Sequence, residues 1–258
     1  KAGCHYLDTT GEQEYVRNVK ARFHEGYKDA GLLLAPATSY MYSLNEIACH
    51  LALETPGVDQ LDSACLPIGT PTVGSTNTIV EMFRTKQFFK KDHEMLQYEP
   101  AVSFDVVCPE YLEPMFTLPW GGSTVPIFFE NDSRVRSCRT LTGFANSQDL
   151  MRNLNEFWKQ WEAEIKHQPK EVQDAALAQL SEGATPTMPP RERLPNSRSV
   201  DYVIGRGNLA STKVTIRSVV PYIVTGYLQA AACIRLFEMT MQNLVSFLQF
   251  RPLVIVTC

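Results

Sequence analysis

The stretch CHYLDTTGEQ, residues 4–13, decides how the fold begins. Residues 4–8 alternate along the chain as the two faces of a β-strand do, and this pattern stops at two threonines and a glycine. Thr10 and Gln13 have the spacing of a capping box, in which each side chain bonds the other residue's backbone N–H at the start of a helix. The stretch therefore predicts a strand that leads directly into a helix.

The next segments continue this alternation. Apolar side chains recur at four-residue spacing and predict a helix with one apolar stripe: Tyr15, Val19, Phe23 and Tyr27. Gly31 lies where a left-handed residue ends such a helix. LLLAP, residues 32–36, is typical of a fully buried parallel strand, and a second helix is expected over residues 42–54. Strand, helix, strand and helix within about 50 residues indicate a βαβ unit.

The remainder of the chain has a more mixed pattern. Strands are expected over residues 58–67, 101–107, 125–129, 138–144, 199–204 and 210–219. Helices are expected around residues 79–83, with Ser75 or Thr76 as N-cap, over 148–165 and 170–181, and from Pro221 onward. The predicted fold class is therefore α/β to α+β, with a mixed, helix-covered sheet after the opening parallel unit.

One short segment matches the pattern of a nucleotide-binding motif. GRGNLA, residues 205–210, fits the dinucleotide fingerprint G-x-G-x-x-A, but that fingerprint needs a helix after its glycines. STKVTI, residues 211–216, is rich in β-branched residues instead, so the string is interpreted as the turn of a β-hairpin. The sequence contains no other glycine cluster for a dinucleotide and no Walker motif.

Composition excludes several classes of protein. The chain has 258 residues, 44% of them hydrophobic, and a net charge of -4 without a basic cluster, so it offers no electrostatic footprint for nucleic acid. Its seven cysteines are scattered without a C-x-x-C pair, which favours reduced thiols and a cytoplasmic location. The five histidines lack metal-ligand spacing, so no metal site is expected. Arg235 and Glu238 interrupt the apolar C-terminal region, which predicts a core helix and not a membrane span.

Five segments resemble the saccharopine dehydrogenase-like oxidoreductases, in particular a bacterial and fungal subgroup. They are KAGCHYLDTTGEQ (1–13), AGLLLAP (30–36), LPWGGSTVPIFFENDSRVRSC (118–138), MPPRERLPNSRSVDYVIGRGN (188–208) and PYIVTGYLQAAACIRL (221–236). The resemblance implies that residues 1–57 are the end of a Rossmann-type nucleotide-binding domain and that residues 58–258 form a substrate and dimerisation domain. The glycine-rich first unit of that family is missing from the sequence and is expected upstream.

The resemblance further implies an NAD(P)-dependent oxidoreductase that forms a homodimer and acts on a small C=O or C=N substrate. The cofactor, NAD or NADP, is expected at the carboxyl ends of the first two strands, which is also where open α/β sheets bind ligands. The residues there are Asp8, Thr9, Thr10, Gly11, Pro36 and Thr38. Tyr40 and Glu12 are the candidate proton donors. Capping or turn formation is the competing explanation for each polar residue, and for Thr10 it is the preferred one.

Two further sets of residues are candidates for binding the substrate. An amino-acid-like substrate would need a carboxylate clamp, for which the loop arginines are candidates: Arg134, Arg136, Arg191, Arg193 and Arg206. The loop from Gly69 to Asn77 enters a helix and is a candidate substrate or anion loop through Gly69, Gly74, Ser75 and Thr76. An ordinary capped helix is the alternative for this loop.

Two other functions stay open at this point. The chain could be a noncatalytic interaction module that retains the fold, or a cofactor-independent isomerase or lyase that uses the same cleft. The missing dinucleotide-binding loop is the feature that separates the oxidoreductase from these alternatives.

Overall fold

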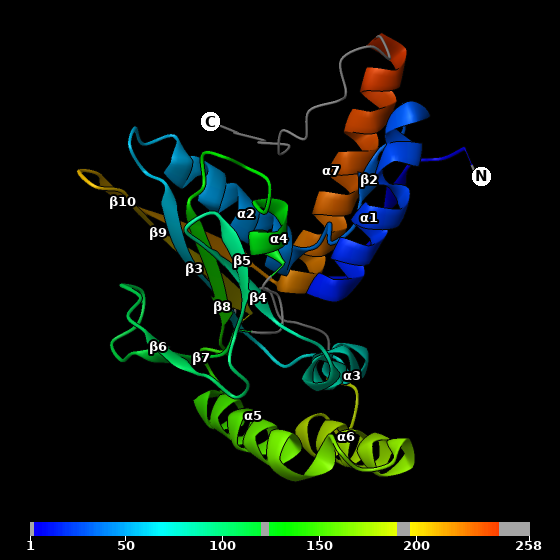
Figure 1. Cartoon of the computed structure of the whole chain (residues 1–258), viewed down its shortest axis with the longest axis vertical. Helices are drawn as coiled ribbons and strands as arrows, with labels where there is room; N and C mark the ends of the chain where they lie inside the picture. Colours follow the sequence, from blue (N-terminus) through cyan, green and yellow to red (C-terminus); the bar gives the residue numbers. More distant parts are fainter. Residues whose placement is uncertain (1–2, 120–123, 190–196, 243–258) are drawn as a thin grey trace.

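A six-stranded mixed sheet forms the centre of the computed structural model, which describes residues 3–119, 124–189 and 197–242 (Figure 1). The strand order is β10-β9-β3-β8-β4-β5. The strands are β3 (Gln60–Ile68), β4 (Phe88–Lys91), β5 (Glu94–Gln97), β8 (Ser137–Thr142), β9 (Arg198–Arg206) and β10 (Ser211–Val219). β3 and β8 are parallel, and the other neighbouring pairs are antiparallel. The expected mixed sheet of an α/β protein is therefore confirmed.

The opening strand–helix–strand unit is also present. β1 (Tyr6–Leu7) pairs in parallel with β2 (Leu34–Ala35), and α1 (Gln13–Asp29) connects them. Gly31 follows the C-cap of α1 with a φ of 64°, the left-handed conformation predicted for it. The Asp8 carboxylate accepts hydrogen bonds from the Thr10 and Ala37 N–H groups, both at 2.9 Å. Asp8 thus holds together the two turns that follow β1 and β2.

Two helices cover one face of the central sheet. α2 (Tyr40–Leu53) lies across β3, β9 and β10, and α4 (Val125–Phe128) lies over β4 and β8. Ala48, Cys49 and Ala52 are fully buried, because these small side chains let α2 approach the sheet closely. Packing therefore crosses the predicted boundary at residues 57 and 58, since α2 of the first unit closes the core of the second.

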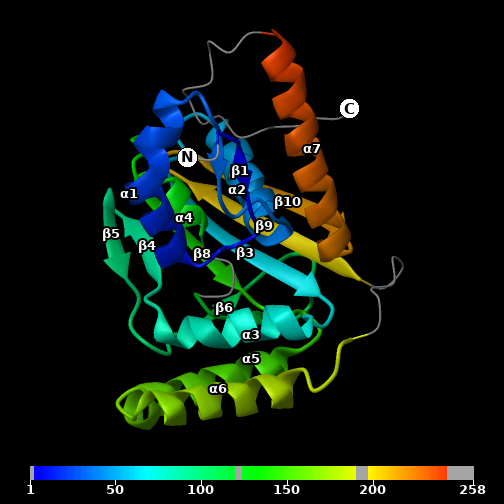
Figure 2. The ribbon, with the colours of Figure 1, turned by 90° about the vertical axis from the view of Figure 1, so that its right-hand side faces the viewer.

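An outer group lies beyond α2. It consists of α1, the β1–β2 pair and α7 (Pro221–Gln242), as the two views show (Figures 1 and 2). The Gln229 amide of α7 donates to the carbonyls of Asp8 at 3.3 Å and Thr38 at 2.5 Å. α7 is thereby fixed to both strand ends of the opening unit.

A second helical group gathers at one end of the molecule (Figure 2). It contains α3 (Val73–Glu81), a 3₁₀ turn (Met82–Arg84), α5 (Gln148–Gln160), a π-helical turn (Trp161–Ile165) and α6 (Lys170–Ala184). Phe83, Trp158 and Trp161 are buried in its core. The hairpin of β6 (Phe104–Val106) and β7 (Met115–Thr117) packs Met115 against the other face of the sheet. α5 and α6 confirm the predicted amphipathic helices.

Several local predictions are wrong. The N-cap of α1 is Glu12, without a side-chain cap bond, and the Gln13 amide instead exchanges hydrogen bonds of 2.9 and 2.5 Å with the backbone of Phe88. A residue of β4 in the central sheet thus replaces Thr10 as the partner of Gln13. Residues 125–129, predicted as a strand, contain the short helix α4, with a proline at its start. The hairpin of β4 and β5 was not predicted at all.

The apolar stripe of α1 is only partly correct. Val19 is buried together with Val16, whereas Tyr15 and Phe23 are 36% and 46% exposed. Only the first two turns of α1 contact the core, and the later turns extend beyond it. The spacing of the apolar residues alone therefore predicts a longer buried face than the helix has.

The hairpin interpretation of residues 205–210 is confirmed. β9 and β10 pair in antiparallel register from Arg198–Val219 to Arg206–Ser211. A Cβ on Gly207 would lie 1.7 Å from the carbonyl oxygen of Gly57, so this glycine allows two backbone segments to touch. Among the helices in the described ranges, none is long and apolar enough to cross a membrane.

Candidate functional site

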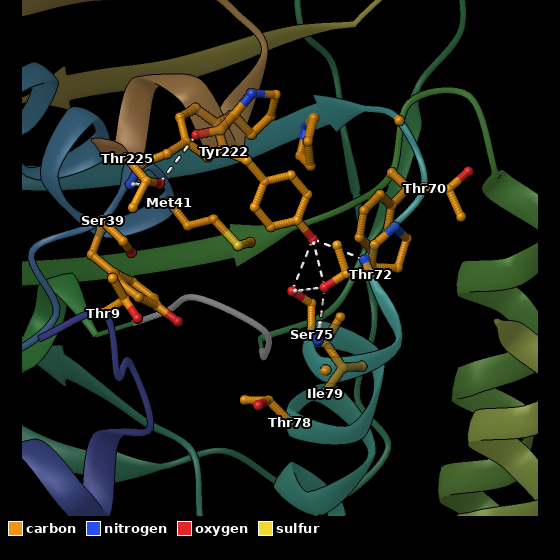
Figure 3. A pocket seen from close by; sticks show the side chains of 18 of the residues that line it. Thr9, Ser39, Met41, Thr70, Thr72, Ser75, Thr78, Ile79, Tyr222 and Thr225 are labelled. Carbon is orange, nitrogen blue, oxygen red and sulfur yellow. Dashed lines mark hydrogen bonds between the residues drawn. The ribbon is translucent and has the colours of Figure 1, made fainter. Parts of the chain in front are cut away.

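A pocket of about 510 Å³ lies where the carboxyl ends of β1, β2 and β3 face the start of α7 (Figure 3). Thr9 and Ser39, which follow β1 and β2, line one side. The end of β3 and the first turns of α3 line the other side, and Tyr222 and Thr225 of α7 complete it. Segments that are nearly 220 residues apart in the chain therefore form one cavity, at the position expected from the strand ends.

Three hydroxyl groups meet at the α3 end of this pocket (Figure 3). Thr72, not Ser75 or Thr76, is the N-cap of α3, and its Oγ1 accepts from the Ser75 N–H at 3.2 Å. The Tyr222 hydroxyl accepts from the Thr72 N–H at 2.9 Å and lies 2.8 Å from the Ser75 Oγ. We call Thr72, Ser75 and Tyr222 the hydroxyl cluster. It joins α7 to α3 at the edge of the pocket.

The predicted substrate loop is divided by the structure. Gly69, Gly74 and Ser75 line the pocket, and a Cβ built on Gly74 would meet no atom within 4 Å. Thr76 is directed away from the pocket, because its buried hydroxyl lies 2.7 Å from that of Thr185. Gly74 therefore leaves open space in the pocket wall, whereas Thr76 joins α3 to the chain just after α6.

Tyr40 lines the pocket but is not a loop residue. α2 begins two residues earlier than predicted, so Tyr40 is its first residue and is only 2% exposed. The Cys65 thiol donates to its hydroxyl at 3.5 Å, and burial raises the pKa of Tyr40 well above its ordinary value. The hydroxyl is thus in contact with the core. Glu12, the other candidate donor, is the N-cap of α1 and does not line the pocket.

A buried polar group lies behind Tyr40. Asp201 of β9 is directly opposite Cys65 of β3 and is fully buried. Burial raises the pKa of Asp201 to about 7, although hydrogen bonds with Asn45, Cys65 and Tyr40 oppose this rise. Sequence reasoning missed Asp201, because a single acidic residue in an alternating strand is ordinarily on the solvent face.

The predicted cofactor residues serve mainly the fold. Thr9 lines the pocket, but the Asp8 carboxylate is already bonded to backbone N–H groups, and Thr38 Oγ1 donates to the Ala35 carbonyl at 3.0 Å. A Cβ on Gly11 would lie 1.6 Å from the Tyr42 ring. Thr10 and Pro36 do not line the pocket. The residues at these two turns do not fit a pyrophosphate, which needs a glycine-rich loop with free N–H groups.

Three of the five candidate clamp arginines do not line the pocket. Three of the candidates are in ion pairs elsewhere: Arg134 with Asp132, Arg136 with Asp59 and Asp92, and Arg206 with Asp62. Arg191 and Arg193 lie outside the described residues. In the part of the chain that the structure describes, no group of three or more His, Cys, Asp or Glu side chains could hold a metal ion.

Comparison with sequence models of protein families identifies the family of this chain. Residues 43–247 match the sequence model of a family of unknown function, DUF5938. The chain belongs to the DUF5938 family. This match begins within α2, so in this DUF5938 protein it includes the β3, α3 and α7 walls of the pocket. No curated protein matches the chain.

Proposed function

We propose that this chain supplies the substrate pocket of an NAD(P)-dependent oxidoreductase that acts on a small C=O or C=N compound. The observation that carries the proposal is the position of the pocket. It lies at the carboxyl ends of β1, β2 and β3, where the opening parallel unit meets the central sheet. Crevices at the carboxyl ends of strands are the usual ligand sites of open α/β sheets.

The parallel pairing of β1 and β2 supports a relation to Rossmann-type domains. Each strand has two residues, and α1 provides the connection between them. Two-residue strands are shorter than the usual strand, and such a short parallel pair fits the margin of a larger sheet. This agrees with the resemblance of residues 1–13 to the saccharopine dehydrogenase-like enzymes.

The cofactor would have to be held by a segment outside residues 1–258. NAD(P) would supply the hydride, and this chain would bind, orient and shield the substrate. Tyr222 and Ser75 can present a hydroxyl proton to a substrate oxygen in the pocket, since their hydroxyls are only 2.8 Å apart and line its wall. Tyr40 is less suited to this role, because its hydroxyl contacts the buried Cys65.

A homodimer is part of the proposal. α7 carries several apolar side chains that are 40% to 75% exposed: Ile223, Tyr227, Ile234 and Phe237. A group of this kind is more often covered by a partner than left in water. Light scattering of the full natural polypeptide would show a dimer, and a monomer at high concentration would contradict this part.

The catalytic proposal is tested by comparing two polypeptides. NADPH fluorescence should show little or no saturable binding to residues 1–258, because the pyrophosphate-binding loop is missing. The full natural polypeptide should bind NADPH and oxidise it with at least one member of a panel of aldehydes, ketones and imines. If the full polypeptide binds no NAD(P)H, the noncatalytic or cofactor-independent function is favoured instead.

A further inference from the structure

We infer that the pocket takes an uncharged, amphipathic molecule with an apolar body and a carbonyl or hydroxyl end. The inference rests on the proposed function, since it names the substrate class of the same pocket. Such a ligand differs from the amino-acid-like substrate that the loop arginines would suit. The carboxylate and ammonium groups of an amino acid need charged partners, whereas the described walls are apolar or carry hydroxyl groups.

Charged side chains are lacking among the described residues of the pocket walls. Among the described residues that line it, there is no Asp, Glu, Lys, Arg or His. Moving an ion from water into such a cavity without a partner is costly, because neither a counter-charge nor a set of charge-assisted hydrogen bonds replaces its hydration. A charged substrate would therefore be disfavoured relative to a neutral one of the same shape.

The remaining walls are divided between apolar and hydroxyl-bearing surfaces. Apolar side chains from α2, β3, α3, the 3₁₀ turn and the segment after β8 form much of the lining: Met41, Ile68, Ile79, Met82 and Phe144. The hydroxyl cluster lies at the α3 end, and Ser39 and Thr9 lie toward the opening unit (Figure 3). Hydroxyl groups both donate and accept, so they suit a carbonyl or hydroxyl oxygen.

The start of α3 is a weaker anion site than its sequence suggests. The Thr72 N–H already has the Tyr222 hydroxyl as acceptor, and the Ser75 N–H has the Thr72 hydroxyl. Helix N-termini bind anions through such free N–H groups. Two of these N–H groups are thus already satisfied within the protein, which leaves the helix end fewer free donors for an anion.

The first experiment uses three probes of equal chain length: octan-2-one, octanoate and octylammonium. Methyl NMR of methionine-labelled residues 1–258 reports binding, because Met41 and Met82 line the pocket and Met115 and Met151, buried elsewhere, serve as internal references. Octan-2-one should shift Met41 and Met82 alone and bind at least tenfold more tightly than either ion. Tighter binding of octanoate or octylammonium, or no shift with octan-2-one, would overturn the inference.

A matched pair of variants locates the binding. Gly74→Leu should reduce the affinity for octan-2-one at least tenfold, because the new side chain projects into open pocket space. Gly26→Leu is the control, since Gly26 of α1 also has no atom within 4 Å of an added Cβ and is remote from the pocket. Equal affinities in the two variants would contradict the assigned site.

A third variant tests the charge argument itself. Thr78→Lys places an ammonium group in the pocket wall and should shift the preference toward octanoate by at least tenfold. An unchanged preference would contradict the electrostatic explanation. None of these measurements uses NADPH or turnover, so the ligand class and the proposed oxidoreductase function can fail separately.

Discussion

The turn from β1 to α1 and the turn from β3 to α3 look alike in sequence but differ in structure. Each leaves a strand, contains glycine and threonine, and enters a helix. In the first turn the Asp8 carboxylate bonds to backbone N–H groups, and the Tyr42 ring fills the space beside Gly11. After the second turn, Gly74 at the start of α3 faces open space and the hydroxyls line the pocket. The comparison teaches that tertiary neighbours decide which of two similar turns can receive a ligand.

Gly11→Ala should have the largest effect on stability, because its Cβ would collide with the Tyr42 ring. Overpacking of this kind costs about 3 kcal/mol where the neighbour cannot move away. Urea denaturation would measure the loss, with Gly26→Ala as the control that should leave stability nearly unchanged or slightly higher. A stable Gly11→Ala protein would mean that the first turn is as open as the second.

Asp201 should make the stability of the protein depend on pH. Its pKa of about 7 in the folded protein exceeds the unfolded value of about 3.9, so the folded state binds the proton more tightly. Between pH 5 and pH 6 the free energy of unfolding should fall by about 1.4 kcal/mol as the pH rises, and this loss should be complete above the folded pKa. Chemical denaturation at several pH values would measure it.

Asp201→Asn should abolish this slope. The affinity for octan-2-one should stay constant over the same pH range in the unsubstituted protein, because no Asp, Glu or His is among the described residues that line the pocket. If the affinity for octan-2-one changes with pH as the stability does, titration of Asp201 affects the pocket, and the expectation that the two are independent is wrong.

Thr72→Ala should remove the N-cap of α3 and one member of the hydroxyl cluster. We expect a loss of about 1 kcal/mol in the free energy of unfolding, typical of a lost threonine cap. Thr10→Ala is the matched change in the first turn, where Thr10 does not cap α1 and a smaller loss is expected. Thermal unfolding of both variants would compare them, and equal losses would argue that the predicted capping box exists in solution.

Gly74→Ala should have the smallest effect on stability, because the added methyl group meets no neighbour. Helix propensity predicts a gain of less than about 1 kcal/mol at this position. The change should weaken octan-2-one binding only slightly, in contrast to Gly74→Leu. A large destabilisation would show that the second turn is closed, like the first.

Much of the local structure could be predicted from residue patterns. The turn of the β9–β10 hairpin follows from its glycines and β-branched flanks, Gly31 ends α1, and Pro221 begins α7. The amphipathic repeat of residues 148–181 likewise predicted α5 and α6. The site was less accessible to prediction. The loop containing Gly74 was identified, but Tyr222 was not, because its hydroxyl reaches Thr72 from about 150 residues away.

The sequence by itself determined the α/β class and the order of most helices and strands. These features depend on periodicity and backbone stereochemistry, which neighbouring residues control. Only the tertiary structure decided that Tyr40 is buried, that Gln13 bonds to Phe88 and that Asp201 lies opposite Cys65. In each case a polar group has a partner from a distant part of the chain. Burying such a group without a hydrogen-bond partner is costly, so the tertiary structure determines where the group can lie.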